Sequence, residues 1–279
     1  MEIFIKILLI LLCVLAALLL LNIVLVMPSR GLKSQRELFY HINFAHRGLH
    51  SRDKKIPENS LAAFKAAVDA GYGIELDLQF SKDEQIVVFH DDTLNRVCKV
   101  NGRVDDFTLA ELKEMRLCKT EERIPLFSEV LELVDGKVPL LVEFKNGPKN
   151  DLLCEKTLPM LRAYKGRFCI ESFSPFIVKW FRKNAPDILR GQLSAPAKEF
   201  EGELGAFSAY ALSHCYTNII CRPHFISYHK KKSYWSVKLA DLLGAMRYVW
   251  TVRPDDDIRG LEKKNDAVIF EFYNPGIKY

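Results

Sequence analysis

The sequence GIELDLQFSKDEQIVVFHD, residues 73–91, contains two apolar runs, Gly73–Leu78 and Ile86–His90. The first run has the length and composition of a buried β-strand. Too few residues separate the two runs for a helix to connect them as parallel strands. The second run is therefore predicted to fold back on the first as its antiparallel hairpin partner.

The turn of this hairpin decides which residue lies opposite His90. A turn centred on Lys82-Asp83 places Glu75 there, and a turn centred on Asp83-Glu84 places Asp77 there. Both registers bring a histidine beside a carboxylate, so the end of this hairpin is a candidate functional site.

Along the rest of the chain, apolar runs of strand length alternate with amphipathic helical patterns. This alternation predicts parallel βα units rather than a sandwich. Eight such units in about 240 residues predict a (β/α)8 TIM barrel, with the hairpin as a small insertion after its second strand. The predicted barrel strands are Phe44–His46, Gly73–Leu78, Pro139–Phe144, Phe168–Ser172, Ile188–Leu193, His224–Tyr228, Tyr248–Val252 and Ala267–Glu271. Predicted helices include Ser60–Ala70, Asp151–Tyr164, Pro175–Asn184 and one that begins with a capping box of Thr108 and Glu111.

Three acidic residues fall at the C-terminal ends of these strands, where barrel active sites are built. Glu75 and Asp77 are two residues apart on one strand and therefore point to the same face, which in a barrel is the interior. Glu143 adds a third acid from the next strand. Three acids in a poorly solvated site repel one another unless a cation compensates. Carboxylate oxygens suit a hard divalent ion, Mg²⁺ or Ca²⁺, better than zinc.

Two histidines and two basic residues belong to the same predicted face. His46 ends the first strand and is followed by Arg47, His90 ends the hairpin, and Lys145 follows the third strand. A single histidine at a strand end is more often structural. Two histidines beside three acids favour a general acid and base pair, and Arg47 and Lys145 supply positive charge for a phosphate. The set predicts phosphodiester chemistry.

The first 36 residues differ from the rest of the chain. Ile7–Met27 is an apolar run of 21 residues with nothing more polar than Asn22. This length fits a transmembrane helix and exceeds the apolar region of a signal peptide, and residues 26–30 form a poor cleavage site. We expect an uncleaved membrane anchor with a basic flank over residues 1–36 and one barrel domain over residues 37–279.

Basic residues near the ends of a span indicate its orientation. Arg30, Lys33 and Arg36 follow the apolar run, whereas Lys6 and the amino terminus precede it. This distribution favours a single-pass protein with its domain on the cytoplasmic side. The seven cysteines form no CxxC pair, which argues against a zinc ribbon and mildly favours a reducing compartment.

The net charge of the chain argues against a nucleic-acid partner. The whole chain carries +5, but the part after residue 36 has 36 basic and 34 acidic residues, or about +2. Nucleic-acid binding proteins usually show a clustered basic face or a strongly basic domain. The sequence does not define the oligomeric state.

Several motifs, in order, resemble the glycerophosphodiester phosphodiesterase family. They are Ala45-His46-Arg47-Gly48, Pro57-Glu58-Asn59-Ser60, Gly73-Ile74-Glu75-Leu76-Asp77, Val88-Phe89-His90-Asp91, Ile124-Pro125-Leu126, Leu141-Val142-Glu143-Phe144-Lys145, Ser172-Phe173 and Val249-Trp250-Thr251-Val252. The resemblance implies a TIM barrel that cleaves a glycerol phosphodiester to glycerol 3-phosphate and an alcohol with the help of one divalent metal ion.

By the same resemblance, the metal ligands are Glu75, Asp77 and Glu143, and the acid and base pair is His46 and His90. Arg47 and Lys145 fall on phosphate-binding positions. The resemblance further implies that Glu58 orients a site histidine or is structural and that Trp250 lines the glycerol pocket.

The chain departs from the family pattern at two places. Arg253 replaces an asparagine of many relatives, and Glu271 lies where the relatives end the last strand with Thr-Asp. Neither departure involves a predicted metal ligand or histidine, but both concern the substrate pocket. The substrate is therefore expected to be a small glycerophosphodiester or, given the anchor, a lysophospholipid.

Two other readings use the same residues. A phosphodiesterase of the same barrel superfamily would release a cyclic phosphate. A membrane-tethered barrel without turnover would bind phospholipid head groups, but such a protein has no need for an acid and base pair beside a metal.

Overall fold

The computed structural model describes residues 1–231 and 233–276, so the last three residues of the predicted domain lie outside it. Within the described residues, eight parallel strands close into a barrel, because β1 pairs with both β2 and β9. The predicted TIM barrel is confirmed. The barrel strands are β1 (Ile42–Ala45), β2 (Gly73–Phe80), β4 (Leu140–Phe144), β5 (Phe168–Ser172), β6 (Arg190–Ser194), β7 (Phe225–His229), β8 (Met246–Val252) and β9 (Ala267–Phe270).

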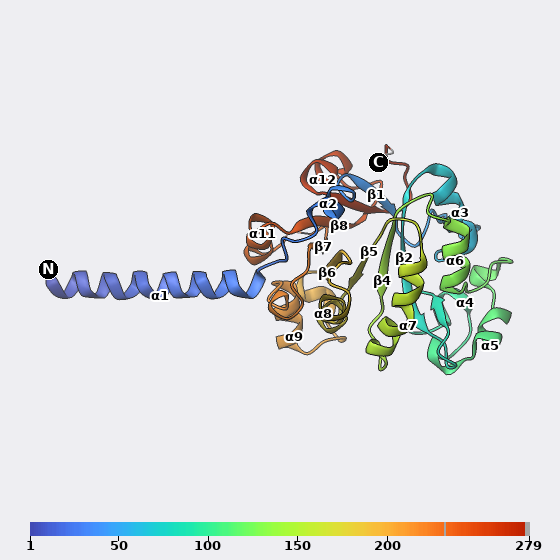
Figure 1. The fold of residues 1–279 in the computed structure, drawn as a ribbon, viewed down its shortest axis with the longest axis horizontal. Helices are drawn as coiled ribbons and strands as arrows, with labels where there is room; N and C mark the ends of the chain where they lie inside the picture. The colour runs from blue at the N-terminus through green and yellow to red at the C-terminus, as the bar shows by residue number, and fades with distance from the viewer. Residues whose placement is uncertain (232, 277–279) are drawn as a thin grey trace.

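Helices surround the barrel and bury their apolar faces against its outer side (Figure 1). Local signals set their ends. The Ser60 side chain accepts a hydrogen bond from the Ala63 amide at the start of α3, and Gly71 ends this helix at a φ of 73°. The helices of the barrel are α3 (Leu61–Ala70), α6 (Phe127–Val134), α7 (Asn150–Ala163), α8 (Pro175–Asn184), α9 (Ala206–Ser213), α10 (Asn218–Cys221), α11 (Trp235–Leu242) and α12 (Ile258–Lys264).

Apolar and acidic side chains alternate along β2, and they point to opposite faces of the strand. Ile74, Leu76 and Leu78 point outward into the apolar layer beneath the helices. Glu75 and Asp77 take the opposite face, inside the barrel. A second apolar cluster, which includes Phe44 and Tyr248, fills part of the interior, so the carboxylates stand above a packed floor.

The hairpin is present, but neither expected register is correct. β3 (Ile86–Val88) runs antiparallel to β2, with Leu78 opposite Val88 and Phe80 opposite Ile86. The observed register lies midway between the two predicted registers and differs from each of them by one residue. The cause is that the loop over residues 81–85 has an odd number of residues. The Ser81 amide closes this loop by donating a 3.0 Å hydrogen bond to the Gln85 carbonyl.

The insertion is larger than the predicted hairpin. After β3, the chain forms α4 (Asn95–Cys98), η1 (Val104–Asp106), α5 (Leu109–Glu114) and η2 (Leu117–Lys119) before it returns to the barrel at α6. These elements surround an apolar cluster of their own, made of Val87, Phe89, Leu94, Val97, Val104, Leu112, Leu117 and Ile124. This apolar cluster of the insertion stabilises the wall of the barrel mouth that carries His90.

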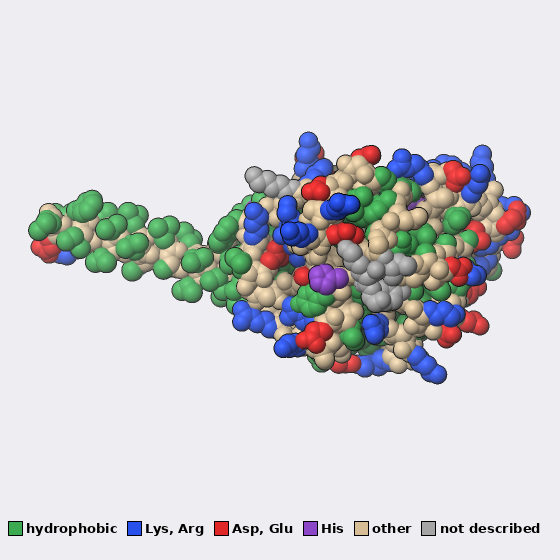
Figure 2. Space-filling model, turned by 90° about the horizontal axis from the view of Figure 1, so that it is seen from above, with side chains coloured by type: hydrophobic (Ala, Val, Ile, Leu, Met, Phe, Trp, Pro, Cys, Tyr) green, Lys and Arg blue, Asp and Glu red, His purple; other side chains and the backbone are tan. Residues whose placement is uncertain are grey.

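A long apolar helix, α1 (Glu2–Val26), projects from the side of the barrel (Figure 1). Among the described residues, this one helix is long and apolar enough to cross a membrane, and none of its most apolar 18-residue window is buried. Such a helix is either a membrane anchor or a signal sequence. Figure 2 shows hydrophobic side chains along most of this helix, with charged side chains at its free end.

The basic flank after α1 packs against the barrel. Residues of this flank form α2 (Lys33–Glu37). Arg30 Nε donates to the Leu243 carbonyl and Arg36 Nη2 to the Gly244 carbonyl, both at 2.7 Å. The flank is therefore part of the packed structure rather than a free linker.

Candidate active site

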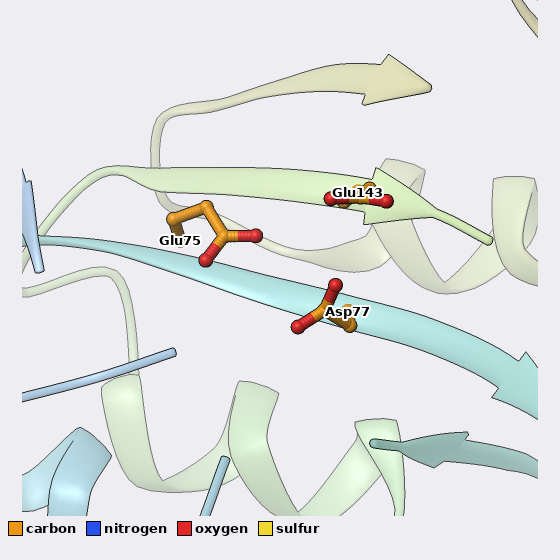
Figure 3. Close-up of side chains that lie close together, drawn as sticks. All are labelled: Glu75, Asp77 and Glu143. Atoms are coloured by element: carbon orange, nitrogen blue, oxygen red, sulfur yellow. The ribbon is translucent and has the colours of Figure 1, made fainter. Parts of the chain in front are cut away.

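Three buried carboxylates from two adjacent strands converge inside the barrel mouth. Asp77 on β2 lies directly opposite Glu143 on β4, and Glu75 lies one inward-facing position earlier on β2. One oxygen from each residue lies within 4.8 Å of the others (Figure 3). The three residues are 0–6% exposed. The register between β2 and β4, together with the two-residue period of a strand, thus creates the cluster.

Burial and mutual repulsion act differently on the three groups. Burial raises the pKa of Glu75 well above its usual value, and the charges of Asp77 and Glu143 raise it further. Burial also raises the pKa of Glu143. For Asp77, burial opposes ionisation, but nearby positive charges and a 2.8 Å hydrogen bond from Asn59 Nδ2 outweigh it and lower its pKa. Burial and mutual repulsion thus oppose full ionisation of the cluster, and a bound cation would offset both effects.

One ammonium group lies among these acids. Lys145 Nζ is 2.9 Å from Glu143 Oε1 and 3.5 Å from Asp77 Oδ1. Burial lowers the pKa of Lys145, but the adjacent Glu143 and Asp77 charges outweigh burial and raise it above its usual value. Lys145 thus stays protonated at the edge of the cluster.

The acidic cluster fits a hard cation. Among the described residues, Glu75 Oε1 and Asp77 Oδ1 are buried and accept no hydrogen bond. Buried carboxylate oxygens without a donor are costly, and a divalent ion is their usual partner in proteins. An all-oxygen donor set favours Mg²⁺ or Ca²⁺ over softer metals but does not distinguish between these two.

His46 stands beside this cluster, held from behind by a carboxylate. Its Nδ1 donates a 2.7 Å hydrogen bond to Glu271 Oε1, and its Nε2 lies 3.8 Å from Glu75 Oε2. Burial and the Arg47 charge lower the pKa of His46 to about 4, despite the opposing effect of Glu271. With Nδ1 engaged, the nitrogen available for chemistry is Nε2.

His90 is also held by a carboxylate. Its Nδ1 donates a 2.7 Å hydrogen bond to Asp91 Oδ1. Arg96 in turn donates to both Asp91 oxygens at 2.7 and 2.9 Å. Burial opposes ionisation of Asp91, but the contacts with His90 and Arg96 outweigh it and lower its pKa. The insertion that carries His90 and Arg96 thus fixes the orientation of the second histidine.

Arg47 and Glu58 form an ion pair at the rim. Arg47 Nη1 donates to Glu58 Oε1 at 2.6 Å, and Arg96 donates to both Glu58 oxygens. Burial opposes ionisation of Glu58, but the two guanidinium groups outweigh it and lower its pKa to about 2. The hydrogen bonds of Glu58 go to arginines rather than to a histidine, so any effect on His90 passes through Arg96 and Asp91.

The Arg47 backbone also contributes to the site. Its amide donates a 2.9 Å hydrogen bond to Glu75 Oε2. This geometry requires a sharp reversal after β1, with φ of 55° at Arg47 and 79° at Gly48. A Cβ on Gly48 would lie 2.9 Å from Ala63, so only glycine fits there.

A cavity of about 390 Å³ connects these groups. Both histidines, Glu75 and Glu143 line it, and one wall is aromatic. The rings of Phe173 and Trp250 meet edge to face at 5.7 Å, and Trp250 Nε1 donates to the Ser227 carbonyl. The cavity thus combines a charged floor with an apolar wall.

Sequence reasoning did not assign roles to several residues of this site. Glu271 and Arg253 were noted only as departures from a pattern, yet Arg253 Nε donates to Glu271 Oε2 at 2.9 Å. His50 Nε2 lies 3.5 Å from Glu271 Oε1. Glu171, buried on β5 opposite Glu143, adds a fourth acid, and burial raises its pKa. Its place at a strand end was a usable signal, whereas the partners of Glu271 lie far away in sequence.

Comparison with known proteins identifies the class and the family of this barrel. The model of the glycerophosphoryl diester phosphodiesterase family matches residues 46–274. A glycerophosphodiester phosphodiesterase of Caldanaerobacter subterraneus is 33% identical over 241 residues, which are 81% of this chain and 91% of that protein. The chain belongs to the glycerophosphoryl diester phosphodiesterase family and is a phosphoric diester hydrolase.

Other relatives agree with this placement. A crystal structure of a Thermotoga maritima glycerophosphodiester phosphodiesterase matches with a TM-score of 0.63 and 25% identity, over 82% of this chain and 93% of that one. An Oleispira antarctica phosphodiesterase in complex with the product sn-glycerol-3-phosphate shares the fold at a TM-score of 0.66 and 23% identity, over 84% and 94%. A lysophospholipase D of Rattus norvegicus is 37% identical over 146 residues, which cover 48% of this chain and 44% of that protein.

Proposed function

We propose that this protein hydrolyses a glycerophosphodiester to glycerol 3-phosphate and an alcohol, with His46 and His90 as general acid and base. The observation that carries the proposal is the matched support of the two histidines. Each donates from Nδ1 to a carboxylate at 2.7 Å, and both line the cavity above the acidic cluster. A protein that only bound a head group would not need this arrangement.

Glu75, Asp77 and Glu143 would hold one divalent ion, Mg²⁺ or Ca²⁺. When bound, such an ion polarises a phosphate oxygen and offsets the charge that develops on the phosphoryl group. Arg47 and Lys145 bind and orient the phosphate from the sides of the cluster. Their charges further reduce repulsion between the substrate and the carboxylates.

The histidines move the protons of the reaction. One histidine accepts a proton at Nε2 from the attacking water or a neighbouring substrate hydroxyl, whose oxygen then forms a bond to phosphorus. The bond between phosphorus and the alcohol oxygen breaks, and the other histidine protonates the departing alkoxide. Glu271 and Asp91 stabilise whichever imidazole carries the charge. Direct attack by water completes the hydrolysis in one displacement, whereas attack by the hydroxyl gives a cyclic phosphate that water must open.

The cavity favours a glycerol group on its aromatic side. Trp250 and Phe173 form this wall, and their ring edges and faces suit the carbon skeleton of glycerol. A lysophospholipid is a second candidate substrate, favoured by α1 and by the similarity to a rat lysophospholipase D.

We also propose that α1 remains as a membrane anchor and that residues 37–279 act as one barrel domain. Lys33 and the barrel-bound Arg30 and Arg36 lie just beyond the apolar run and favour the cytoplasmic side for the barrel. A fusion of a reporter to the C-terminus, scored for activity on either side of the membrane, tests this orientation.

The experiment for the activity uses the full chain in detergent micelles with glycerophosphocholine, glycerophosphoethanolamine and lysophosphatidylcholine. We expect release of glycerol 3-phosphate from the first two, or release of choline from the third, and loss of turnover in His46→Ala. A cyclic phosphate as the final product would assign the related cyclising reaction. Binding of these compounds without turnover, equal in the His46→Ala variant, would identify a head-group binder.

A further inference from the structure

The C-terminal turn of α1 is fixed to the barrel by polar contacts. Arg222 Nη1 donates to the carbonyls of Val24 and Met27, both at 2.9 Å. Asn218 Nδ2 donates to the Val26 carbonyl at 3.0 Å. These bonds cap the free carbonyls of the helix end, and the Val26 side chain is fully buried in the barrel. The helix therefore sets the orientation of the barrel relative to anything in which the helix is embedded.

The contact with the barrel begins before the apolar run ends. The residues of α1 up to Leu21 are exposed, whereas Asn22 is half-buried and accepts a 3.0 Å hydrogen bond from the Tyr216 hydroxyl. The uncharged stretch free of the barrel is thus Ile7–Leu21, which at 1.5 Å per residue spans about 22 Å. The hydrocarbon core of a bilayer is about 30 Å thick. A bilayer that takes up the whole run must therefore reach the barrel surface around Asn22.

That surface carries aromatic side chains. The rings of His214 and Tyr234 stack with their centroids 4.0 Å apart. The centroid of the Tyr210 ring lies 4.1 Å from that of His214. The ring of Tyr216, whose hydroxyl bonds to Asn22, has its centroid 5.4 Å from that of His214. Tyrosine and tryptophan concentrate where a membrane meets water, because their rings are apolar and their polar atoms reach the head groups.

Exposed apolar side chains extend this surface over two helices. On α11, which packs beside α1, Trp235 is 57% and Leu242 is 84% exposed, and their spacing of seven places them on one helix face. On α9, Phe207 is 83% exposed. Both helices lie on the side of the barrel from which α1 projects (Figure 1). Hydrophobic side chains continue from α1 onto this side of the barrel, with Lys and Arg side chains beside them (Figure 2).

We propose that the surface formed by Phe207, Tyr210, Trp235 and Leu242, here called the α9–α11 face, rests in the head-group layer of a lipid bilayer. Three independent features favour a bilayer over a protein partner: the rigid junction with α1, the short free length of the apolar run and the aromatic side chains at the helix end. The exposed Lys238 lies between Trp235 and Leu242 on α11 and is suited to anionic head groups.

This docking places the cavity close to the membrane. The buried side of α9 packs Ala209 and Leu212 against Phe200. Phe200 meets Phe173 of the cavity wall edge to face at 5.9 Å. The α9 helix thus separates the bilayer from the aromatic wall of the cavity.

The test uses the full chain in phosphatidylcholine vesicles with 20% phosphatidylserine, in which the phosphatidylcholine is brominated near the head-group end of the acyl chains. Bromine quenches tryptophan emission only at close range. We expect strong quenching that is mostly lost in Trp235→Phe. The matched control adds Ala110→Trp to Trp235→Phe, because Ala110 is exposed on α5, on the side of the barrel opposite to α1. Its added emission should remain unquenched.

Two outcomes overturn the proposal. In one, the vesicle-bound protein shows the same quenching in the wild type, in Trp235→Phe and in the control, so that the α9–α11 face is in water. In the other, the full chain does not float with the vesicles in a density gradient. The readout is optical, so it remains valid whichever substrate the site turns over.

Discussion

His46 and Glu271 lie 225 positions apart in sequence, yet the histidine Nδ1 donates a 2.7 Å hydrogen bond to the glutamate Oε1. β1 and β9 are adjacent in the closed barrel, with Ala45 opposite Phe270, and so carry the two residues to the same point. Burial of Glu271 opposes its ionisation, but His46, His50 and Arg253 outweigh it and hold its pKa well below the usual range. A charged acceptor thus faces Nδ1, and Nε2 is left for the proton transfer that we propose for His46.

Glu271 therefore acts as a positioning residue for His46. We expect Glu271→Gln to lower kcat roughly 10- to 100-fold with little change in KM, a loss typical of residues that orient a functional imidazole. The neutral amide no longer stabilises the charged ring, so the pH profile of kcat should also shift. Steady-state kinetics across pH would check both effects, and Arg253→Lys serves as a milder control. An unchanged kcat and pH profile would show that Glu271 is only structural.

The acidic cluster should be required for turnover but not for folding. We expect Glu75→Gln to lower kcat/KM by roughly 100-fold or more, because a cluster with two acids holds a cation poorly. In the absence of metal, the Tm should stay the same or rise, because the substitution removes one of several mutually repelling acids. Activity assays and calorimetric unfolding in EDTA would test this pair of effects. Unfolding of the variant would instead identify the cluster as structural.

The rim ion pairs should make stability sensitive to acid. Glu58 has a pKa of about 2 in the folded protein against 4.5 in an unfolded chain. Its ion pairs therefore stabilise the fold fully above pH 4.5, and this contribution is lost as the pH falls toward 2, because the unfolded chain binds the proton first. We expect Glu58→Gln to reduce the free energy of unfolding at pH 7 and to flatten its acid dependence.

Urea unfolding of the detergent-solubilised protein at pH 7, 4 and 3 would measure this dependence. Asp69→Asn provides the control, because the ion pair of Asp69 with Lys65 on α3 is exposed. Equal slopes for the wild type and Glu58→Gln would refute the assigned role of the Arg47 and Arg96 contacts.

The α9–α11 face should affect lipid substrates selectively. If the cavity draws lysophosphatidylcholine from the bilayer, Trp235→Asp with Leu242→Asp should lower its turnover in vesicles several-fold. Turnover of soluble glycerophosphocholine should stay unchanged, because both residues lie outside the cavity. Ala110→Asp on α5 is the matched surface control. Equal losses on both substrates would indicate a folding defect instead.

The barrel could be predicted from sequence because its signals are local. Each strand is an apolar run, and the two-residue period of β2 alone placed Glu75 and Asp77 on one face. The hairpin was predicted for the same reason. Its register was not, because it depends on how the Ser81 amide closes an odd-numbered loop.

The supporting residues of the site depend on contacts that sequence spacing does not reveal. Glu271 and Arg253 were visible only as departures from a family pattern, and the hydrogen bond that joins their side chains is seen only in the folded protein. Arg96 belongs to an insertion that folds around its own apolar cluster, so its contacts with Glu58 and Asp91 depend on the packing of that insertion.

The most direct test of the proposed chemistry is the initial rate of glycerol 3-phosphate release from glycerophosphocholine by the full chain. It should be measured with Mg²⁺ or Ca²⁺, after EDTA, and after the metal is restored, beside His46→Ala and His90→Ala. We predict turnover that EDTA abolishes and the metal restores, and that falls by about 10²- to 10⁴-fold in each variant. Full activity in EDTA, or in either histidine variant, would contradict the account.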